Sequence, residues 1–145
     1  MPTRVHQGDV VVVDNDNENR ESTAKHLTDL GYTVTQCIDG TQCVRLLERK
    51  SWQWNPKIVL IDSILPGVSS FELLRRLNKQ FEKKETILIM TSKYDAPEDE
   101  MEAGTAGAVG FVVKPFTEQH LNTILSRVEE KKLRAEKIAQ GLPSN

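Results

Sequence analysis

Short apolar runs alternate along the chain with segments in which apolar residues recur every three or four positions. Apolar runs of four to seven residues, bounded by polar or turn-forming residues, are typical of strands that are buried in a sheet. The runs occupy residues 10–13, 32–38, 58–61, 87–90 and 109–113. Because a helical pattern follows each run, the alternation predicts a parallel sheet whose strands are joined by crossover helices.

Capping residues indicate where the intervening helices begin and end. Asp16 and Asn17 are favoured N-cap residues, and Gly31 is of the type that commonly follows a helix. Helices are expected over about 17–30, 41–50, 71–77, 97–106 and from Thr117 onward. Right-handed crossovers then predict an α/β fold, a (βα)5 flavodoxin-like doubly wound parallel sheet with strand order 2-1-3-4-5.

Four of the five apolar runs end on a residue suited to phosphoryl chemistry, namely Asp14, Asp62, Thr91 and Lys114. Ligands of open parallel sheets sit just beyond the carboxyl ends of the strands, so these side chains are expected at one edge. A carboxylate can accept a phosphoryl group, and a lysine neutralises the charge of that group. Paired carboxylates also suit a hard cation such as Mg²⁺.

Composition adds limits on the class of protein. The chain has 145 residues and a formal net charge of −2, which favours one domain and gives no reason to expect nucleic-acid binding. No apolar stretch approaches the roughly 20 residues of a membrane span, and no secretion signal is evident. Cys37 and Cys43 are interpreted as reduced packing residues, and we expect a cytoplasmic protein.

The chain divides into three parts by pattern and charge. Residues 1–7 form an N-terminal tail, 8–129 form the domain, and 130–145 form a charged C-terminal helix extension or a linker. Trp52 and Trp54 lie in a connector, where we expect one to pack under the sheet and the other to be partly exposed. The last helix has a weak heptad pattern, so homodimer formation stays an open hypothesis.

Four motifs carry a resemblance to a known family. They are Val-Val-Val-Asp14, Ile-Asp62 with Leu65-Pro66 after it, Met-Thr91-Ser92, and Gly110-Phe111-Val112-Val113-Lys114-Pro115-Phe116. In this order and spacing, residues 8–129 resemble the response-regulator receiver domain of two-component signalling. The resemblance implies a phosphoacceptor module that switches partner binding and assists its own phosphotransfer and dephosphorylation, without being an enzyme that turns over a free substrate.

The resemblance also implies a role for each site residue. Asp62 is the phosphoacceptor, supplied by a histidine kinase or phosphotransfer protein, and Thr91 and Lys114 assist the transfer. Thr91 and Phe111 are the switch residues, and the 97–116 face contacts an output domain or partner protein. Mg²⁺ is the implied cofactor, and its implied ligands are Asp14, Asn15, Asp62 and the backbone carbonyl of Ile64. The bond between Lys114 and Pro115 is expected to be cis.

Two positions depart from the family pattern. Asn15 stands where relatives have a second acidic metal ligand, so the sequence predicts weaker Mg²⁺ binding, and Asp16 either compensates or caps the following helix. Ser70 stands where many relatives have glycine, and we expect no consequence.

Two other functions stay open. One is a degenerate receiver that signals without phosphorylation, which Asn15 motivates. The other is a phosphatase of the haloacid-dehalogenase type, because Asp14-Asn15-Asp16 resembles its Asp-x-Asp motif, with Asp14 as the nucleophile. Substitution of Asp62 discriminates between a receiver and that phosphatase.

Overall fold

The computed structural model describes residues 8–49, 56–81 and 85–141 of the chain. The predictions made for the tail 1–7 and for Trp52 and Trp54 lie outside these residues. The strands are β1 (Asp9–Val13), β2 (Thr33–Cys37), β3 (Ile58–Asp62), β4 (Ile87–Ser92) and β5 (Gly110–Val113). The helices are α1 (Asn17–Leu30), α2 (Gly40–Arg49), α3 (Ser70–Gln80), α4 (Pro97–Ala106) and α5 (Glu118–Ala139).

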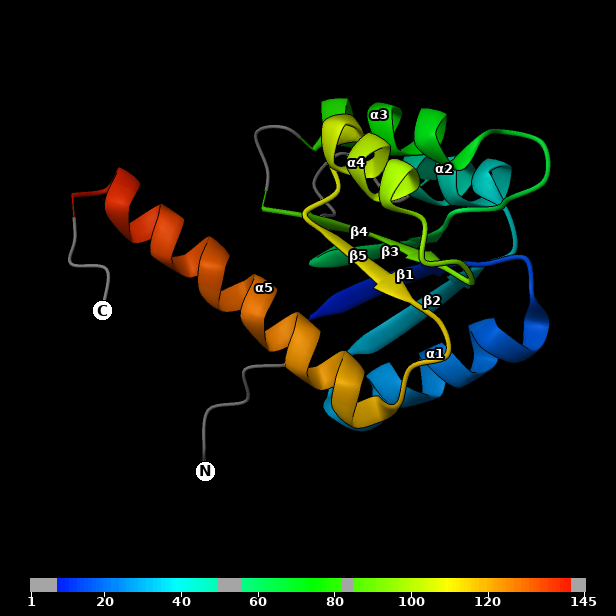
Figure 1. Ribbon diagram of the computed structural model, residues 1–145, viewed down its shortest axis with the longest axis horizontal. Coiled ribbons are helices and arrows are strands. Elements are labelled where there is room, and N and C mark those ends of the chain that lie inside the picture. The colour runs from blue at the N-terminus through cyan, green and yellow to red at the C-terminus, as the bar shows by residue number, and fades with distance from the viewer. Residues whose placement is uncertain (1–7, 50–55, 82–84, 142–145) are drawn as a thin grey trace.

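The five strands form one parallel sheet in the order β2-β1-β3-β4-β5. This order confirms the predicted α/β doubly wound fold. Helices α2, α3 and α4 cover one face of the sheet, and α1 and α5 cover the other, as Figure 1 shows. The order in which strands are added to the sheet reverses between β1 and β3, which places the carboxyl ends of these two strands beside the crevice of the sheet.

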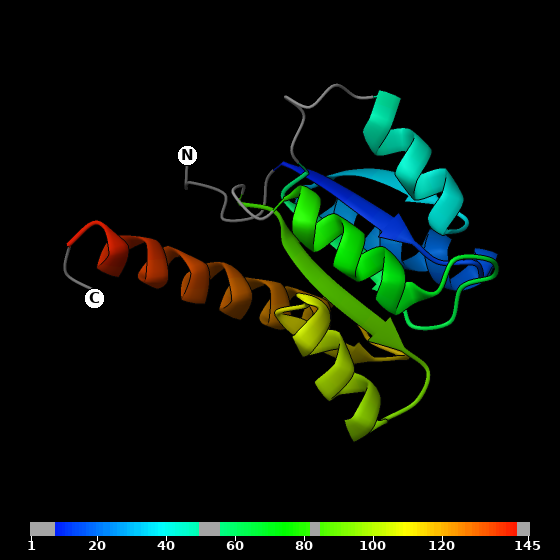
Figure 2. The ribbon, with the colours of Figure 1, turned by 90° about the horizontal axis from the view of Figure 1, so that it is seen from above.

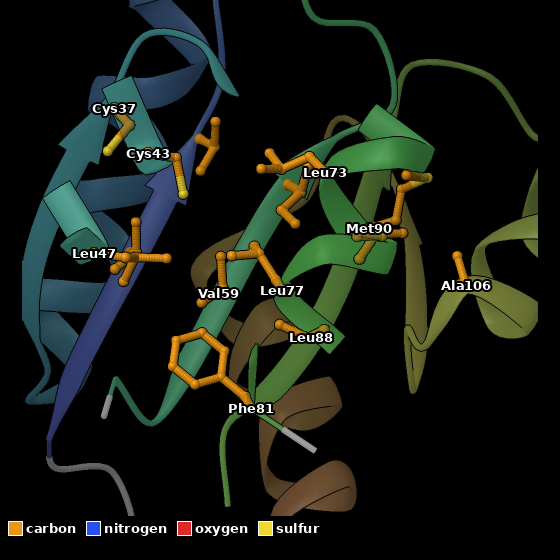
Figure 3. Close-up of a cluster of buried hydrophobic side chains, with 14 of the residues drawn as sticks. Cys37, Cys43, Leu47, Val59, Leu73, Leu77, Phe81, Leu88, Met90 and Ala106 are labelled. Atoms are coloured by element: carbon orange, nitrogen blue, oxygen red, sulfur yellow. The ribbon is translucent and has the colours of Figure 1, made fainter. Parts of the chain in front are cut away.

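Two apolar clusters, one on each face, account for the continuous apolar runs. Val11 and Val13 pack with α2 and α3, whereas Val10 and Val12 pack with α1 and α5. Figure 3 shows the first cluster, in which Leu73 and Leu77 of α3 lie over β3 and β4. Because both faces of each central strand are buried, polar residues are excluded until the strand ends.

The ends of α1 follow the predicted capping chemistry. The side chain of Asp16 accepts a hydrogen bond from the Asn19 backbone N–H at 3.1 Å, which makes Asp16 the N-cap. Gly31 adopts a left-handed φ of 114° and closes the helix through the carbonyls of Leu27 and Thr28. The Tyr32 N–H also binds Leu27, so β2 begins one residue later than the apolar run.

Helix α5 begins at its N-cap Thr117 and continues without a break to Ala139, well past the sheet (Figures 1 and 2). Its residues Leu121 and Leu125 are buried in the second apolar cluster, against the sheet. Near the amino edge of the sheet, Glu129 accepts a hydrogen bond from the Tyr32 hydroxyl at 3.0 Å and pairs with Lys57 at 3.2 Å. These contacts fix the direction in which the rest of α5 leaves the domain.

Two further expectations concern cysteines and membranes. Cys37 and Cys43 are free thiols buried in the first cluster, in agreement with their predicted packing role.

Among the described residues, no helix combines the length and apolar character needed to cross a bilayer.

Gly107 and Gly104 provide a matched test of the α4 terminus. Gly107 has a φ of +117°, and an added Cβ would lie 2.4 Å from the side chain of Asn78, whereas a Cβ at Gly104 would meet nothing. We expect Gly107→Ala to lower the free energy of unfolding by about 1–2 kcal/mol, because a left-handed conformation is unfavourable for alanine. Gly104→Ala should raise it by about 0.5–1 kcal/mol because alanine favours a helix. Urea denaturation measures the free energy of unfolding of both variants. Equal changes in the two would contradict the assignment of Gly107 as the left-handed residue that ends α4.

Candidate functional site

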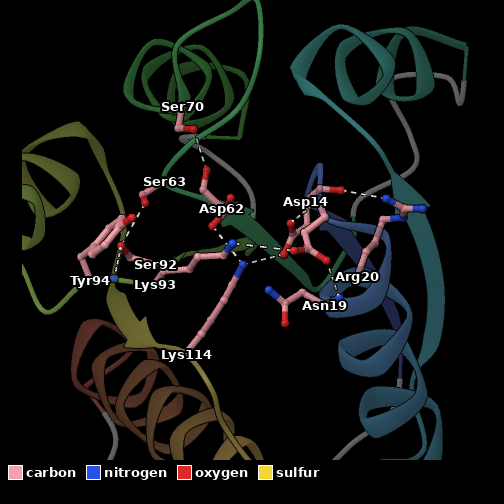
Figure 4. Close-up of polar contacts among 11 residues, drawn as sticks. Asp14, Asn19, Arg20, Asp62, Ser63, Ser70, Ser92, Lys93, Tyr94 and Lys114 are labelled. Carbon is pink, nitrogen blue, oxygen red and sulfur yellow. Dashed lines mark hydrogen bonds and ion pairs between the residues drawn. The ribbon is translucent and has the colours of Figure 1, made fainter.

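The four residues predicted at the strand ends meet at the carboxyl edge of the sheet. Asp14 directly follows β1, Asp62 ends β3, Thr91 lies opposite Asp62 in the β3–β4 register, and Lys114 directly follows β5. Asp14, Asp62 and Thr91 are buried, with 3%, 8% and 4% of their surfaces exposed. Figure 4 shows the two carboxylates turned toward the same ammonium. The sheet therefore brings together residues that are as much as 100 positions apart.

Lys114 joins the two carboxylates. Its Nζ lies 2.6 Å from Asp14 Oδ2 and 3.0 Å from Asp62 Oδ1, and only 6% of its side chain is exposed. The Lys114 backbone N–H donates to the Ser92 carbonyl at 2.7 Å, which ties the end of β5 to β4. The bond from Lys114 to Pro115 is cis, as expected. One ammonium between two carboxylates leaves a formal charge of −1 in a buried pocket.

The pKa of Asp62 is raised above its ordinary value because burial disfavours the charged carboxylate. Lys114 opposes this effect through a hydrogen bond and its charge, and the backbone N–H of Ile64 does so more weakly. The charge of Asp14 acts in the same direction as burial. The site thus holds Asp62 as a carboxylate in surroundings that disfavour its charge.

Asn15 and Asp16 extend the acidic edge only in part. Asn15 is exposed, and its side-chain amide donates to the Ile38 carbonyl at 3.2 Å, on the side of β2. Asp16 caps α1 and lies 3.7 Å from the exposed Lys93. Of the two roles considered for Asp16, the structure therefore gives it the capping role. Its backbone N–H also donates to Asp14 Oδ1 at 2.9 Å, which orients that carboxylate.

Oxygen donors in this pocket fit a hard divalent cation. Asp14 and Asp62 supply carboxylates, and each has further lone pairs beyond the hydrogen bonds described. The formal charge of −1 also favours a cation, and the Asn15 amide oxygen and the Ile64 carbonyl are neutral donors of the same type. No group of three or more His, Cys, Asp or Glu side chains suited to a metal occurs among the described residues. The negative charge available to a cation at this site is thus that of the carboxylates of Asp14 and Asp62.

Several polar residues that support the site were not identified as site residues by the sequence analysis. Arg20 is buried on α1, and its Nη1 donates to the Asp14 carbonyl at 3.0 Å. The Ser70 hydroxyl donates to the Asp62 carbonyl at 2.5 Å, so this departure from the family pattern makes a specific contact. The Ser63 hydroxyl donates to that of Ser92 at 3.0 Å. These contacts are visible only in the folded chain. Of the residues that make them, the sequence pattern drew attention to Ser70 alone.

The two predicted switch residues occupy adjoining strands. Thr91 is buried in β4, and its carbonyl accepts a hydrogen bond from the Ser63 N–H at 2.7 Å. Phe111 in β5 is opposite Met90, is partly buried, and packs against the cluster beneath α4. Both residues are thus connected to the part of the sheet that α4 covers.

The comparison with protein families identifies the chain. The model of the response regulator receiver domain matches residues 10–126, which is most of the sequence. The chain belongs to the response regulator receiver family.

Curated relatives include chemotaxis and sensory proteins. The chain is 28% identical over 123 residues to chemotaxis protein CheY of Pseudomonas aeruginosa, covering 84% of this chain and 96% of CheY. It is 26% identical over 104 residues to the sensory transduction protein LytT of Oceanobacillus iheyensis. That match covers 69% of this chain and only 40% of LytT.

Solved receiver structures share the fold. Chemotaxis response regulator CheY4 of Vibrio cholerae is 27% identical, with a TM-score of 0.75 over 84% of this chain and 98% of that chain. NtrX from Brucella abortus has a TM-score of 0.81 and 24% identity over 92% of this receiver but only 30% of NtrX. A BeF3-activated DrrB receiver domain has a TM-score of 0.72 and 24% identity, over 83% of this chain and 96% of that chain.

Titration of Asp62 provides a test of the site's electrostatics. Its raised pKa means that the folded receiver binds a proton more readily than the unfolded chain, so the charged form opposes folding at neutral pH. Asp62→Asn should therefore raise the free energy of unfolding at pH 7 by up to about 1 kcal/mol. The gain should shrink as the pH falls toward the pKa of the carboxyl, because Asp62 itself then becomes neutral.

Chemical denaturation at a series of pH values measures this effect, and Asp29→Asn is the control. Lys25 hydrogen-bonds to Asp29 and lowers the pKa of that exposed carboxyl, so the control substitution should slightly lower stability at pH 7. A loss of stability in Asp62→Asn at pH 7 would contradict the electrostatic account.

Proposed function

We propose that this receiver is a phosphoacceptor in which Asp62 takes a phosphoryl group from a histidine kinase or a phosphotransfer protein. The observation that carries the proposal is the buried arrangement of Asp62 and Asp14 about Lys114 at the carboxyl edge of the sheet. Family membership supports a signalling role, and the geometry supports the choice of Asp62. We further propose that the protein works in the cytoplasm.

Asp62 acts as the nucleophile in the proposed transfer. A carboxylate oxygen of Asp62 forms a bond to phosphorus while the bond from phosphorus to the donor oxygen or nitrogen breaks, and the leaving group keeps the electron pair. With acetyl phosphate as donor the leaving group is acetate. The Lys114 ammonium, already 3.0 Å from Asp62, neutralises charge that spreads over the phosphoryl oxygens. The Thr91 hydroxyl is the proposed hydrogen-bond donor to one of them.

Mg²⁺ is the proposed cofactor of the transfer. Asp14, Asp62, the Ile64 carbonyl and Asn15 would hold it, and it would supply positive charge that stabilises the transferring phosphoryl group. Asp14 is kept in position by the Asp16 N–H and by the contact of Arg20 with its carbonyl. The chain thus fixes the acidic side of the pocket independently of Lys114.

The proposed output is a change in partner binding on the 97–116 face. Thr91 and Phe111 lie on the two strands that adjoin α4, and phosphorylation would bias their arrangement. Within this segment Met101 and Val109 are 75% and 63% exposed, so the face offers apolar contacts to an output domain or a partner protein.

Incubation with acetyl phosphate and Mg²⁺ tests the proposed acceptor. Wild type should gain one phosphoryl group by mass spectrometry, and Asp62→Asn should gain none because its carboxylate nucleophile is absent. The matched control Asp39→Asn, at an exposed carboxylate in the β2–α2 turn, should be modified like wild type. Modification that persists in Asp62→Asn and disappears in Asp14→Asn would favour the haloacid-dehalogenase-type alternative.

Mg²⁺ titration tests the degenerate-receiver alternative, which the contact of Asn15 with Ile38 favours. Asn15→Asp should bind Mg²⁺ more tightly than wild type, by about tenfold, because it restores a charged oxygen ligand. Titration followed by NMR chemical shifts of the strand-end residues measures the dissociation constant, and Asn19→Asp on α1 serves as a control for added charge. Tighter binding in the control than in Asn15→Asp would overturn this role of Asn15.

A further inference from the structure

The two cysteines of the chain lie in contact with each other. Cys37 is the last residue of β2, and Cys43 lies in the first turn of α2. Both side chains are buried in the first apolar cluster, with 1% and 0% of their surfaces exposed. Their free thiols share a side-chain hydrogen bond, and Figure 3 shows them together at one end of the cluster. The fold therefore holds two sulfur atoms in a position from which one covalent bond can join them.

Short-range hydrogen bonds already close the segment between the two cysteines. The Cys43 N–H donates to the Asp39 carbonyl at 3.2 Å, and the Gln42 N–H donates to the Asp39 side chain at 2.8 Å. The Gln42 side chain accepts a hydrogen bond from the Ile38 N–H at 2.7 Å. A disulfide from Cys37 to Cys43 would therefore close a loop that is already formed, which keeps the conformational cost of the bond small.

The surroundings of the two thiols differ. The hydrogen bond from Cys43 and, more weakly, the charge of Arg20 lower the pKa of Cys37, against the opposing effects of burial and Asp39. The same hydrogen bond and burial raise the pKa of Cys43. Cys37 is thus the thiol that more readily becomes a thiolate, which is the form that attacks an oxidant. Cys43 is the neighbouring thiol that can complete a disulfide.

The backbone that carries Cys37 also holds the acidic edge of the candidate site. The Cys37 carbonyl accepts a hydrogen bond from the Asp14 N–H at 3.0 Å, and the Ile38 carbonyl accepts one from the Asn15 amide at 3.2 Å. A disulfide brings its sulfur atoms to about 2.05 Å, closer than two thiols that share a hydrogen bond. Formation of the bond therefore draws Cys37 toward α2 and shifts both carbonyls relative to Asp14 and Asn15.

We propose that Cys37 and Cys43 form a reversible disulfide when the protein meets hydrogen peroxide, and that this bond lowers the affinity of the acidic edge for Mg²⁺. The second part rests on the proposed function, in which Asp14 and Asn15 are metal ligands. Both sulfurs are buried, so the oxidant has to be as small as a peroxide. Thiols of cytoplasmic proteins are kept reduced, so the disulfide is transient, as redox-sensing disulfides in that compartment are.

The reaction takes place in two steps. The Cys37 thiolate attacks one oxygen of hydrogen peroxide, the O–O bond breaks, and the leaving hydroxide takes up a proton to become water, which leaves a sulfenic acid on Cys37. The Cys43 sulfur then attacks the Cys37 sulfur, the S–O bond breaks, and the Cys43 proton leaves with the oxygen as a second water. The thiols are thereby oxidised and the peroxide is reduced to water. A small dithiol reverses the bond by thiol–disulfide exchange and is itself oxidised.

Hydrogen peroxide in small molar excess over the full chain tests the first part. Wild type should lose the mass of two hydrogen atoms, yield a peptide in which Cys37 is linked to Cys43, and regain its thiols with dithiothreitol. Cys43→Ala should instead gain one oxygen atom at Cys37 and form no disulfide within the chain. Sulfoxide at Met101, which is 75% exposed, also adds oxygen, but dithiothreitol does not remove it. Thermal melts followed by circular dichroism verify that the variant is folded.

NMR spectra of the reduced and the oxidised protein test the second part. Oxidation should shift the backbone amide signals of Asp14 and Asn15 even without Mg²⁺, because their hydrogen-bond acceptors move. The dissociation constant for Mg²⁺ should rise roughly tenfold, since groups that orient the metal ligands are displaced. Cys43→Ala treated with peroxide in the same way is the matched control, and it should keep the Mg²⁺ affinity that it had before treatment.

Three results would overturn the proposal. These are thiols that stay reduced when folded wild type meets peroxide, a disulfide that forms only after urea unfolds the chain, or a disulfide that changes neither the Asp14 signal nor the Mg²⁺ affinity. Acetyl phosphate added to reduced wild type tests phosphoacceptance without the disulfide. A failure there would contradict the proposed function and would not affect the disulfide, so the two failures are distinguishable.

Discussion

The ammonium of Lys114 contacts two buried carboxylates that would repel each other without it. Burial of a charged group is unfavourable unless the group is paired and hydrogen-bonded, and removing the cation of such a pair, which leaves the carboxylates uncompensated, costs about 3–5 kcal/mol. Lys114 pairs with both Asp14 and Asp62. It reaches them because β5, which Lys114 directly follows, lies next to β4 in the sheet. The arrangement of all five strands therefore determines whether the acidic pocket is stable.

The surroundings of the pocket hold its backbone and leave the carboxylate of Asp62 unfavourably placed. Arg20 and Ser70 donate to the carbonyls of Asp14 and Asp62, so the positions of both residues are fixed from α1 and from α3. The Asp62 carboxylate nevertheless has a raised pKa, since burial outweighs the contact with Lys114. A rigid backbone around a carboxylate whose charge is incompletely compensated is a suitable arrangement for a group that acquires a cation or a phosphoryl group.

The two ends of the sheet differ in chemistry because the strands are parallel. All carboxyl ends meet at the edge that carries Asp62, and the amino ends meet near a groove lined by Phe81 and Val109. Glu129 anchors α5 at the amino edge, so the charged continuation of that helix becomes a wall of the groove. The residues after 129 thus belong to a surface of the domain, although by charge alone they are equally consistent with a linker.

The sequence by itself determined the α/β fold, the strand order and the four residues at the strand ends. Short continuous apolar runs bounded by polar or turn-forming residues favour strands covered on both faces, and parallel strands bring their carboxyl ends together. Only the tertiary structure decided that Asn15 turns toward Ile38 and that Ser70 contacts Asp62. A short polar side chain near a turn has several partners within reach, and its choice depends on distances set by elements far away in the chain. The groove beside α5 was beyond sequence reasoning for the same reason, because its sides come from α3, β4, α5 and the segments that connect elements far apart in the chain.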